Sequence, residues 1–169
     1  IEQLPLEWFV SDGVVLDFDG REDGDAIGAT DVESALAAAG HEIKPLDIVL
    51  VRTGCDRWID TAEYMAHGPG VTAGATHWLY ERGVRVMGID AWGWDRPLWM
   101  QAQEAIESGE KGIFWEAHQA DLAYSQIERL VNLGSLPPTG FTVSCLPLPL
   151  VGGSAAPARV VAMLDDERD

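Results

Sequence analysis

Short apolar runs alternate with amphipathic stretches along the first two thirds of the chain. The apolar runs are rich in β-branched residues, as is typical of buried strands, and fall at residues 13–18, 48–52 and 84–89. Helical patterns occupy residues 30–39, 73–82 and 97–108. Because strands and helices alternate, the pattern predicts parallel strand pairing and an α/β domain.

Local signals mark where the first helix begins and ends. Thr30 and Glu33 match a capping box, in which the hydroxyl satisfies an early helix N–H and the carboxylate reaches back to the cap. Gly40 follows the last alanine and predicts the end of this helix, since glycine adopts the left-handed conformation easily.

Two further strands are expected near the end of the chain, over residues 141–148 and 159–164. Pro147 and Pro149 have no N–H to donate to a neighbouring strand. The strand over 141–148 should therefore lie at an edge of the sheet or leave it there.

Length and charge limit the possible functions. The 169 residues fit one domain spanning 1–169, and no run of about 20 apolar residues and no secretory leader pattern occurs, so a cytoplasmic protein without membrane contact is expected. A net charge of -17 repels phosphate backbones and argues against a nucleic-acid partner. Cys55 and Cys145 show no ligand spacing and are expected to be reduced and structural.

The stretch over residues 115–133 combines an imidazole, carboxylates and an aromatic ring with an amphipathic pattern. Its His118 and Glu128 are candidate ligands of a divalent metal or an acid–base pair, because imidazole nitrogen and carboxylate oxygen serve both chemistries. The alternative for His118 is a hydrogen-bonded histidine on the surface. Glu128 lies among apolar residues, where a carboxylate needs a cation or a raised pKa.

A tryptophan-rich segment follows the third predicted strand. Trp92, Trp94 and Trp99 predict an aromatic wall or an oligomer contact. Asp90 comes at the carboxyl end of a predicted parallel strand, where open α/β sheets bind ligands, and Asp95 follows the tryptophan pair. Turn formation is the alternative role for both aspartates. No GxSxG elbow, phosphate loop or GxGxxG occurs, so serine hydrolase and nucleotide-binding functions lack support.

The order of several sequence blocks resembles a known family. The blocks are GVVLDF, IKPLDIVLVRTG, PGVTAGATHWLYERGVRVMGIDAWGWD, His118 with QIERLVNL, and GFTVSCLPLPLVGGSAAPARVVAML. Together they are similar to the cyclase-like metal-dependent hydrolases, the family of bacterial kynurenine formamidase and isatin hydrolase. The resemblance covers nearly the whole chain, and its tryptophan-rich block is closer to the isatin hydrolase branch.

The resemblance implies a swivelling β/β/α fold with a mixed sheet and flanking helices, commonly in an oligomer. It implies a Mn²⁺ or Zn²⁺ centre that hydrolyses the C–N bond of a small aromatic or cyclic amide, formamide or lactam. His118 and Glu128 match two late metal-site residues of the family, although in lactam-cleaving relatives the histidine can lie next to the metal ligands without binding the metal itself. Trp92 and Trp94 are candidates to face the substrate ring, with core packing as the alternative.

One family motif is absent. The main ligands of the family lie in an HxGTHxDxPxH motif, and no such motif occurs in these 169 residues. The resemblance therefore implies a C-terminal portion that is inactive alone, with the N-terminal ligands either on a missing segment or on a second chain, and a homo-oligomer is the other expected assembly. A non-catalytic homologue or binding subunit is the alternative. Ring closure of a polyketide type is a third possibility, which no residue favours.

Overall fold

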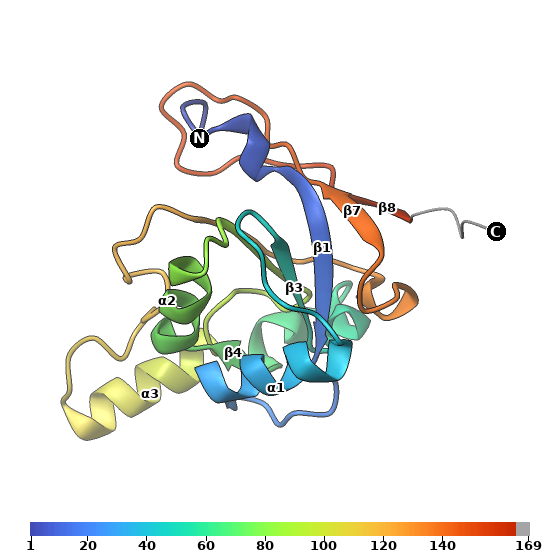
Figure 1. The fold of residues 1–169 in the computed structure, drawn as a ribbon. Coiled ribbons are helices and arrows are strands. Elements are labelled where there is room, and N and C mark those ends of the chain that lie inside the picture. The colour runs from blue at the N-terminus through green and yellow to red at the C-terminus, as the bar shows by residue number, and fades with distance from the viewer. Residues whose placement is uncertain (165–169) are drawn as a thin grey trace.

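The computed structural model describes residues 1–164, and its centre is a six-stranded mixed sheet with the order β6-β5-β3-β1-β7-β8 (Figure 1). The first four strands in this order are parallel, whereas β7 and β8 join by antiparallel pairing. The strands are β1 Val10–Asp17, β3 Ile48–Arg52, β5 Val86–Ile89, β6 Ser125–Ile127, β7 Phe141–Ser144 and β8 Val161–Leu164. A separate parallel pair comprises β2 Ala26–Ile27 and β4 Gly70–Val71. The mixed α/β fold expected from the resemblance is confirmed.

Three α-helices occupy the described chain, and Figure 1 shows α1 and α2 on one side of the sheet. They are α1 Ala29–Ala39, α2 Ala73–Glu81 and α3 Leu98–Ser108. Short 3₁₀ turns occur at Leu6–Trp8, Cys55–Trp58, Ala62–Ala66 and Leu133–Ser135. Within residues 1–164, no helix has the length and apolar character needed to cross a membrane.

The apolar runs divide their side chains between the two faces of the sheet, because successive residues of a strand point to opposite sides. Val14 and Leu16 of β1 belong to the core beneath α1 and α2, together with Leu36 and Leu79 of those helices. Val15 points to the opposite face, where it joins residues of β3, β7 and the segment after β6. Burial on both faces explains why the strands lack a polar alternation.

The first helix does not begin as the sequence predicted. Gly28 is the N-cap, and the Asp31 carboxylate accepts a hydrogen bond from the Gly28 N–H at 2.9 Å. Thr30 already lies inside α1, so the capping box at Thr30 and Glu33 is wrong; the carboxylate of Asp31, two residues before Glu33, performs this role. The predicted end at Gly40 is confirmed, with φ at 65°.

The two C-terminal strands are shorter than predicted. β7 ends at Ser144, before Pro147 and Pro149, and β8 begins at Val161. The chain leaves the sheet as the prolines require, but β7 does not lie at an edge, because it pairs with β1 on one side and β8 on the other. The intervening loop lies beside the N-terminus, whose amino group donates to the Gly153 carbonyl at 2.6 Å (Figure 1).

Candidate functional site

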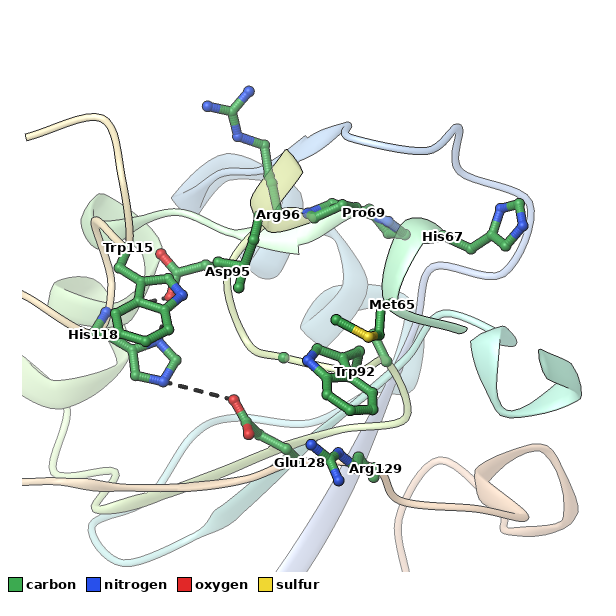
Figure 2. A pocket seen from close by; sticks show the side chains of 14 residues that line it. Met65, His67, Pro69, Trp92, Asp95, Arg96, Trp115, His118, Glu128 and Arg129 are labelled. Atoms are coloured by element: carbon green, nitrogen blue, oxygen red, sulfur yellow. Dashed lines mark hydrogen bonds and ion pairs between the residues drawn. The ribbon is translucent and has the colours of Figure 1, made fainter. Parts of the chain in front are cut away.

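A cavity of about 290 Å³ lies beyond the carboxyl ends of β5 and β6. Its walls come from four segments (Figure 2): the residues after β5, the connection between α3 and β6, the residues after β6, and the residues in and after the 3₁₀ turn that precedes β4. This is the edge at which parallel α/β sheets bind ligands. The side chains that define its chemistry are Trp92, Asp95, Trp115, His118, Glu128 and Arg129.

Asp95 fixes the position of His118. Its buried carboxylate accepts hydrogen bonds from the backbone N–H of Ala117 at 2.8 Å and of His118 at 3.3 Å. The imidazole Nδ1 lies 2.5 Å from the same carboxylate, and because a carboxylate is an acceptor, Nδ1 carries the proton. The imidazole is therefore held with Nε2 directed into the cavity.

Glu128 faces this free nitrogen from the opposite wall. Its Oε1 lies 3.6 Å from His118 Nε2, and both side chains are 34% exposed (Figure 2). The same oxygen accepts from the Trp94 N–H at 3.4 Å, which anchors the carboxylate on the segment after β5. The structure thus brings together the two residues that the sequence proposed as a pair.

The spacing of these two atoms fits one shared divalent cation. Nitrogen and oxygen ligands at about 2.0–2.1 Å from a tetrahedral ion lie roughly 3.3 Å apart, close to the observed 3.6 Å. Metal-bound imidazoles commonly donate their second N–H to a carboxylate, as His118 does to Asp95. Across residues 1–164, however, no set of three His, Cys, Asp or Glu side chains forms a metal cluster. The donors described here fit part of a metal site.

The pKa of His118 is raised. The hydrogen bond to Asp95 is the main cause, and the charges of Asp95 and Glu128 add to it, against the opposing effect of burial. In the metal-free protein a proton can therefore occupy Nε2 and face Glu128, the place where a cation would bind.

This raised pKa predicts the pH dependence of stability without metal. A histidine with a raised folded-state pKa stabilises the fold below its unfolded pKa, about 6.5, and this contribution is lost as pH rises through the folded-state pKa. We expect His118→Gln to reduce the free energy of unfolding more at pH 5.5 than at pH 9, measured by urea unfolding in EDTA. An equal loss at both pH values would contradict the role of the charged imidazole. His77→Gln, at an exposed position of α2, provides the control.

The tryptophans divide between the cavity and the core. Trp92 lines the cavity, whereas Trp94 has 0% exposure and its indole N–H donates to Thr76 Oγ1 at 3.0 Å. Trp94 therefore packs in the core, and its assignment as a residue facing the substrate is corrected. Trp115 forms another wall, stacked on His118 with 5.2 Å between ring centroids.

Asp90 has a structural role. Its buried carboxylate accepts from the Thr53 N–H at 2.7 Å, the Thr53 hydroxyl at 2.6 Å and the Gly54 N–H at 2.9 Å. Burial raises the pKa of Asp90, although these hydrogen bonds oppose the shift. These partners lie 36 and 37 positions away in the sequence, so Asp90 joins the ends of β5 and β3; it does not line the cavity, and its contacts are not those of a local turn.

Two contributions to the cavity were missed by reasoning from the sequence. The first is the hydrogen bond between Asp95 and His118, which are 23 positions apart in the sequence. The sequence feature that could have indicated it is an aspartate shortly after a parallel strand. Arg129 projects from beside Glu128, and its guanidinium carbon lies 3.6 Å from the centre of the Trp92 ring. No sequence spacing indicated this contact.

Comparison with known proteins agrees with the mixed α/β fold and with the family resemblance. The family model described as "Putative cyclase" matches residues 1–96. No match was found among curated proteins.

Among solved structures, isatin hydrolase A from Ralstonia solanacearum is 26% identical, with a TM-score of 0.79. The match spans 97% of this chain and 64% of that hydrolase. An isatin hydrolase bound to the product analogue thioisatinate has 21% identity, a TM-score of 0.78, and coverage of 96% and 63%. A potential metal-dependent hydrolase with cyclase activity has 26% identity, a TM-score of 0.69, and coverage of 99% and 71%. The chain thus spans somewhat less than two thirds of the length of the two isatin hydrolases. With a family model matching more than half of its residues, the chain belongs to the cyclase family.

Proposed function

We propose that this chain contributes the His118 and Glu128 side of the active site of a metal-dependent hydrolase. The observation that carries the proposal is the 3.6 Å separation of His118 Nε2 and Glu128 Oε1 across a cavity at the carboxyl edge of the sheet. The proposed reaction is hydrolysis of the C–N bond of a small aromatic or cyclic amide, formamide or lactam. Its support is the similarity at 26% identity to a solved isatin hydrolase and to a potential metal-dependent hydrolase.

The proposed cation is Mn²⁺ or Zn²⁺, held by His118 and Glu128. Imidazole and carboxylate suit both ions. When bound, the ion would supply Lewis-acid activation of a water molecule and of the amide carbonyl. Because metal sites of catalytic zinc enzymes use three protein ligands, we propose that further donors come from another segment, a second copy of the chain or a partner chain.

The residues of this chain have separate tasks in the proposed reaction. Asp95 holds the imidazole, so that His118 Nε2 either binds the cation or moves a proton to the departing nitrogen. Trp92 and Trp115 provide flat apolar walls against which an aromatic substrate can stack. Stacking and exclusion of water then orient the amide toward His118 and Glu128.

Hydrolysis assays test the proposed reaction. A preparation that contains the complete set of ligands, supplied with Mn²⁺ or Zn²⁺, is expected to hydrolyse isatin, N-formylkynurenine or a related lactam. His118→Ala and Glu128→Gln should each lower kcat/KM by at least about 100-fold, whereas His77→Ala in α2 should leave it unchanged. If both His118→Ala and Glu128→Gln keep their activity and their bound metal, the proposal is wrong. Metal binding without turnover of any such amide would favour a binding subunit.

A further inference from the structure

Arg129 is an unusual residue for its backbone position. Its φ is 63°, in the left-handed region that glycine adopts freely and other residues adopt at a cost. Backbone hydrogen bonds fix this conformation: the Arg129 N–H donates to the Ala91 carbonyl at 3.1 Å and the Leu130 N–H to the Ile89 carbonyl at 3.0 Å. The fold therefore imposes the strain, and an arginine side chain does nothing to relieve it. Backbone strain of this kind concentrates at functional sites.

The Arg129 guanidinium also lacks the hydrogen-bonded partners that most arginines of residues 1–164 have. Arg52 and Arg96 pair with carboxylates, and Arg82 donates to a carbonyl. Among residues 1–164, no carboxylate or carbonyl oxygen pairs with the Arg129 guanidinium, which lies over the Trp92 ring, although the chain carries a net charge of -17. The neighbouring Glu128 carboxylate points toward His118 (Figure 2).

Stacking on Trp92 orients the free guanidinium at the cavity. With its central carbon 3.6 Å from the ring centre, the cation lies over the indole face, and the ring holds it without consuming N–H donors. Both side chains line the cavity that contains His118 and Glu128. An arginine held in this way matches a carboxylate by two parallel hydrogen bonds, next to the aromatic walls of Trp92 and Trp115.

We propose that Arg129 is the anion-recognition residue of this cavity, and that its ligands are aromatic molecules carrying a carboxylate. The proposal extends the function proposed above by naming the substrate or product class, and in that respect it rests on that function. In an active preparation, a higher KM in Arg129→Gln would identify the carboxylate as part of the substrate. Weaker product inhibition with unchanged KM would place it on the product.

The direct test is binding of benzoate, with benzamide as the neutral probe of equal shape. The chain, without metal and at low salt, is titrated with each probe while the Trp92 indole N–H signal is followed by NMR. We expect benzoate to bind at least tenfold more tightly than benzamide, and Arg129→Gln to weaken benzoate at least tenfold with little effect on benzamide. A tenfold change in the dissociation constant corresponds to about 1.4 kcal/mol of binding free energy, which is less than many hydrogen bonds to charged groups contribute.

Two further variants separate recognition from folding. Arg129→Gly should preserve or increase stability, since glycine suits the left-handed backbone, and should still lose benzoate binding. Arg82→Gln removes the same type of contact, an arginine 3.5 Å from the Trp78 ring, away from the cavity, and should bind benzoate like the parent chain.

Failure of this inference is distinguishable from failure of the proposed function. Absence of benzoate binding, equal binding of benzamide, or unchanged benzoate affinity in Arg129→Gln would overturn the role of Arg129. None of these measurements requires metal or turnover. If Arg129 binds benzoate but no metal binds at His118 and Glu128, the anion site stands and the hydrolase proposal fails.

Discussion

Replacing Asp95 with alanine is expected to lower the free energy of unfolding by about 3 kcal/mol, because it leaves buried donors without an acceptor. The Ala117 N–H, on a residue with 0% exposure, and the imidazole Nδ1–H both depend on this carboxylate. The same change frees the His118 ring, so affinity for a cation at Nε2 should fall about 10- to 100-fold. Chemical unfolding and metal titration measure the two effects.

Two variants make this prediction specific to the Asp95 contacts. Asp95→Asn keeps the size and one acceptor oxygen, so its loss of stability should be smaller, while the pKa of His118 should move down without the carboxylate charge. Asp60→Ala, on an exposed residue outside the cavity, should change stability by less than about 0.5 kcal/mol. Equal stability of Asp95→Ala and Asp60→Ala would contradict the structural role of Asp95.

Trp94→Ala is expected to lower the free energy of unfolding by about 3–5 kcal/mol, the usual cost of removing a large buried aromatic side chain. Trp94 has 0% exposure and packs in the core beneath α1 and α2, where its indole N–H also donates to Thr76. Thermal unfolding followed by circular dichroism measures the effect. If Trp94→Ala instead reduced ligand affinity and left the free energy of unfolding unchanged, the result would support a Trp94 that faces the substrate.

Trp99 provides the matched control for Trp94. Trp99 is 52% exposed at the first turn of α3, so Trp99→Ala should cost no more than about 1 kcal/mol. Trp94→Phe should lose less stability than Trp94→Ala, since it retains most of the buried ring and gives up the hydrogen bond to Thr76.

The sequence predicted β1, β3, β5 and the three helices because their patterns are local, whereas it did not predict the short strands β2, β4 and β6. The runs at β1, β3 and β5 are β-branched and buried on both faces, so their type is evident without a partner. The start of α1 was misplaced because two neighbouring acidic residues compete for the same cap, and tertiary structure selects Asp31. The position of β7 depended on pairing with β1 and β8, which no local pattern encodes.

The candidate site was predictable in its residue types and not in its contacts. His118 and Glu128 were selected for their chemistry, and the fold places them across one cavity. Trp92 and Trp94 looked equivalent, yet they are two residues apart and one faces the cavity while the other enters the core. Arg129 and Trp92 lie in two loops that follow different strands. They meet because β6 and β5 are neighbours in the sheet, and no local sequence pattern encodes that order.

Paramagnetic broadening by Mn²⁺ tests most directly whether His118 and Glu128 share a cation. Substoichiometric Mn²⁺ is added to the metal-free chain, and the indole N–H signals are followed by NMR. This readout detects weak binding by two ligands, and it separates a localised ion from counterions attracted by the net charge of -17. The matched control variant is His77→Ala with Glu81→Gln, which removes an exposed imidazole and carboxylate from α2.

We predict that the signals of Trp92 and Trp115, which line the cavity, broaden at lower Mn²⁺ than that of Trp78 in α2. Combined His118→Ala and Glu128→Gln substitution should remove this preference, and the control variant should retain it. Broadening of all indole signals at the same Mn²⁺ concentration, or an unchanged preference in the His118 and Glu128 variant, would contradict a metal site at these residues.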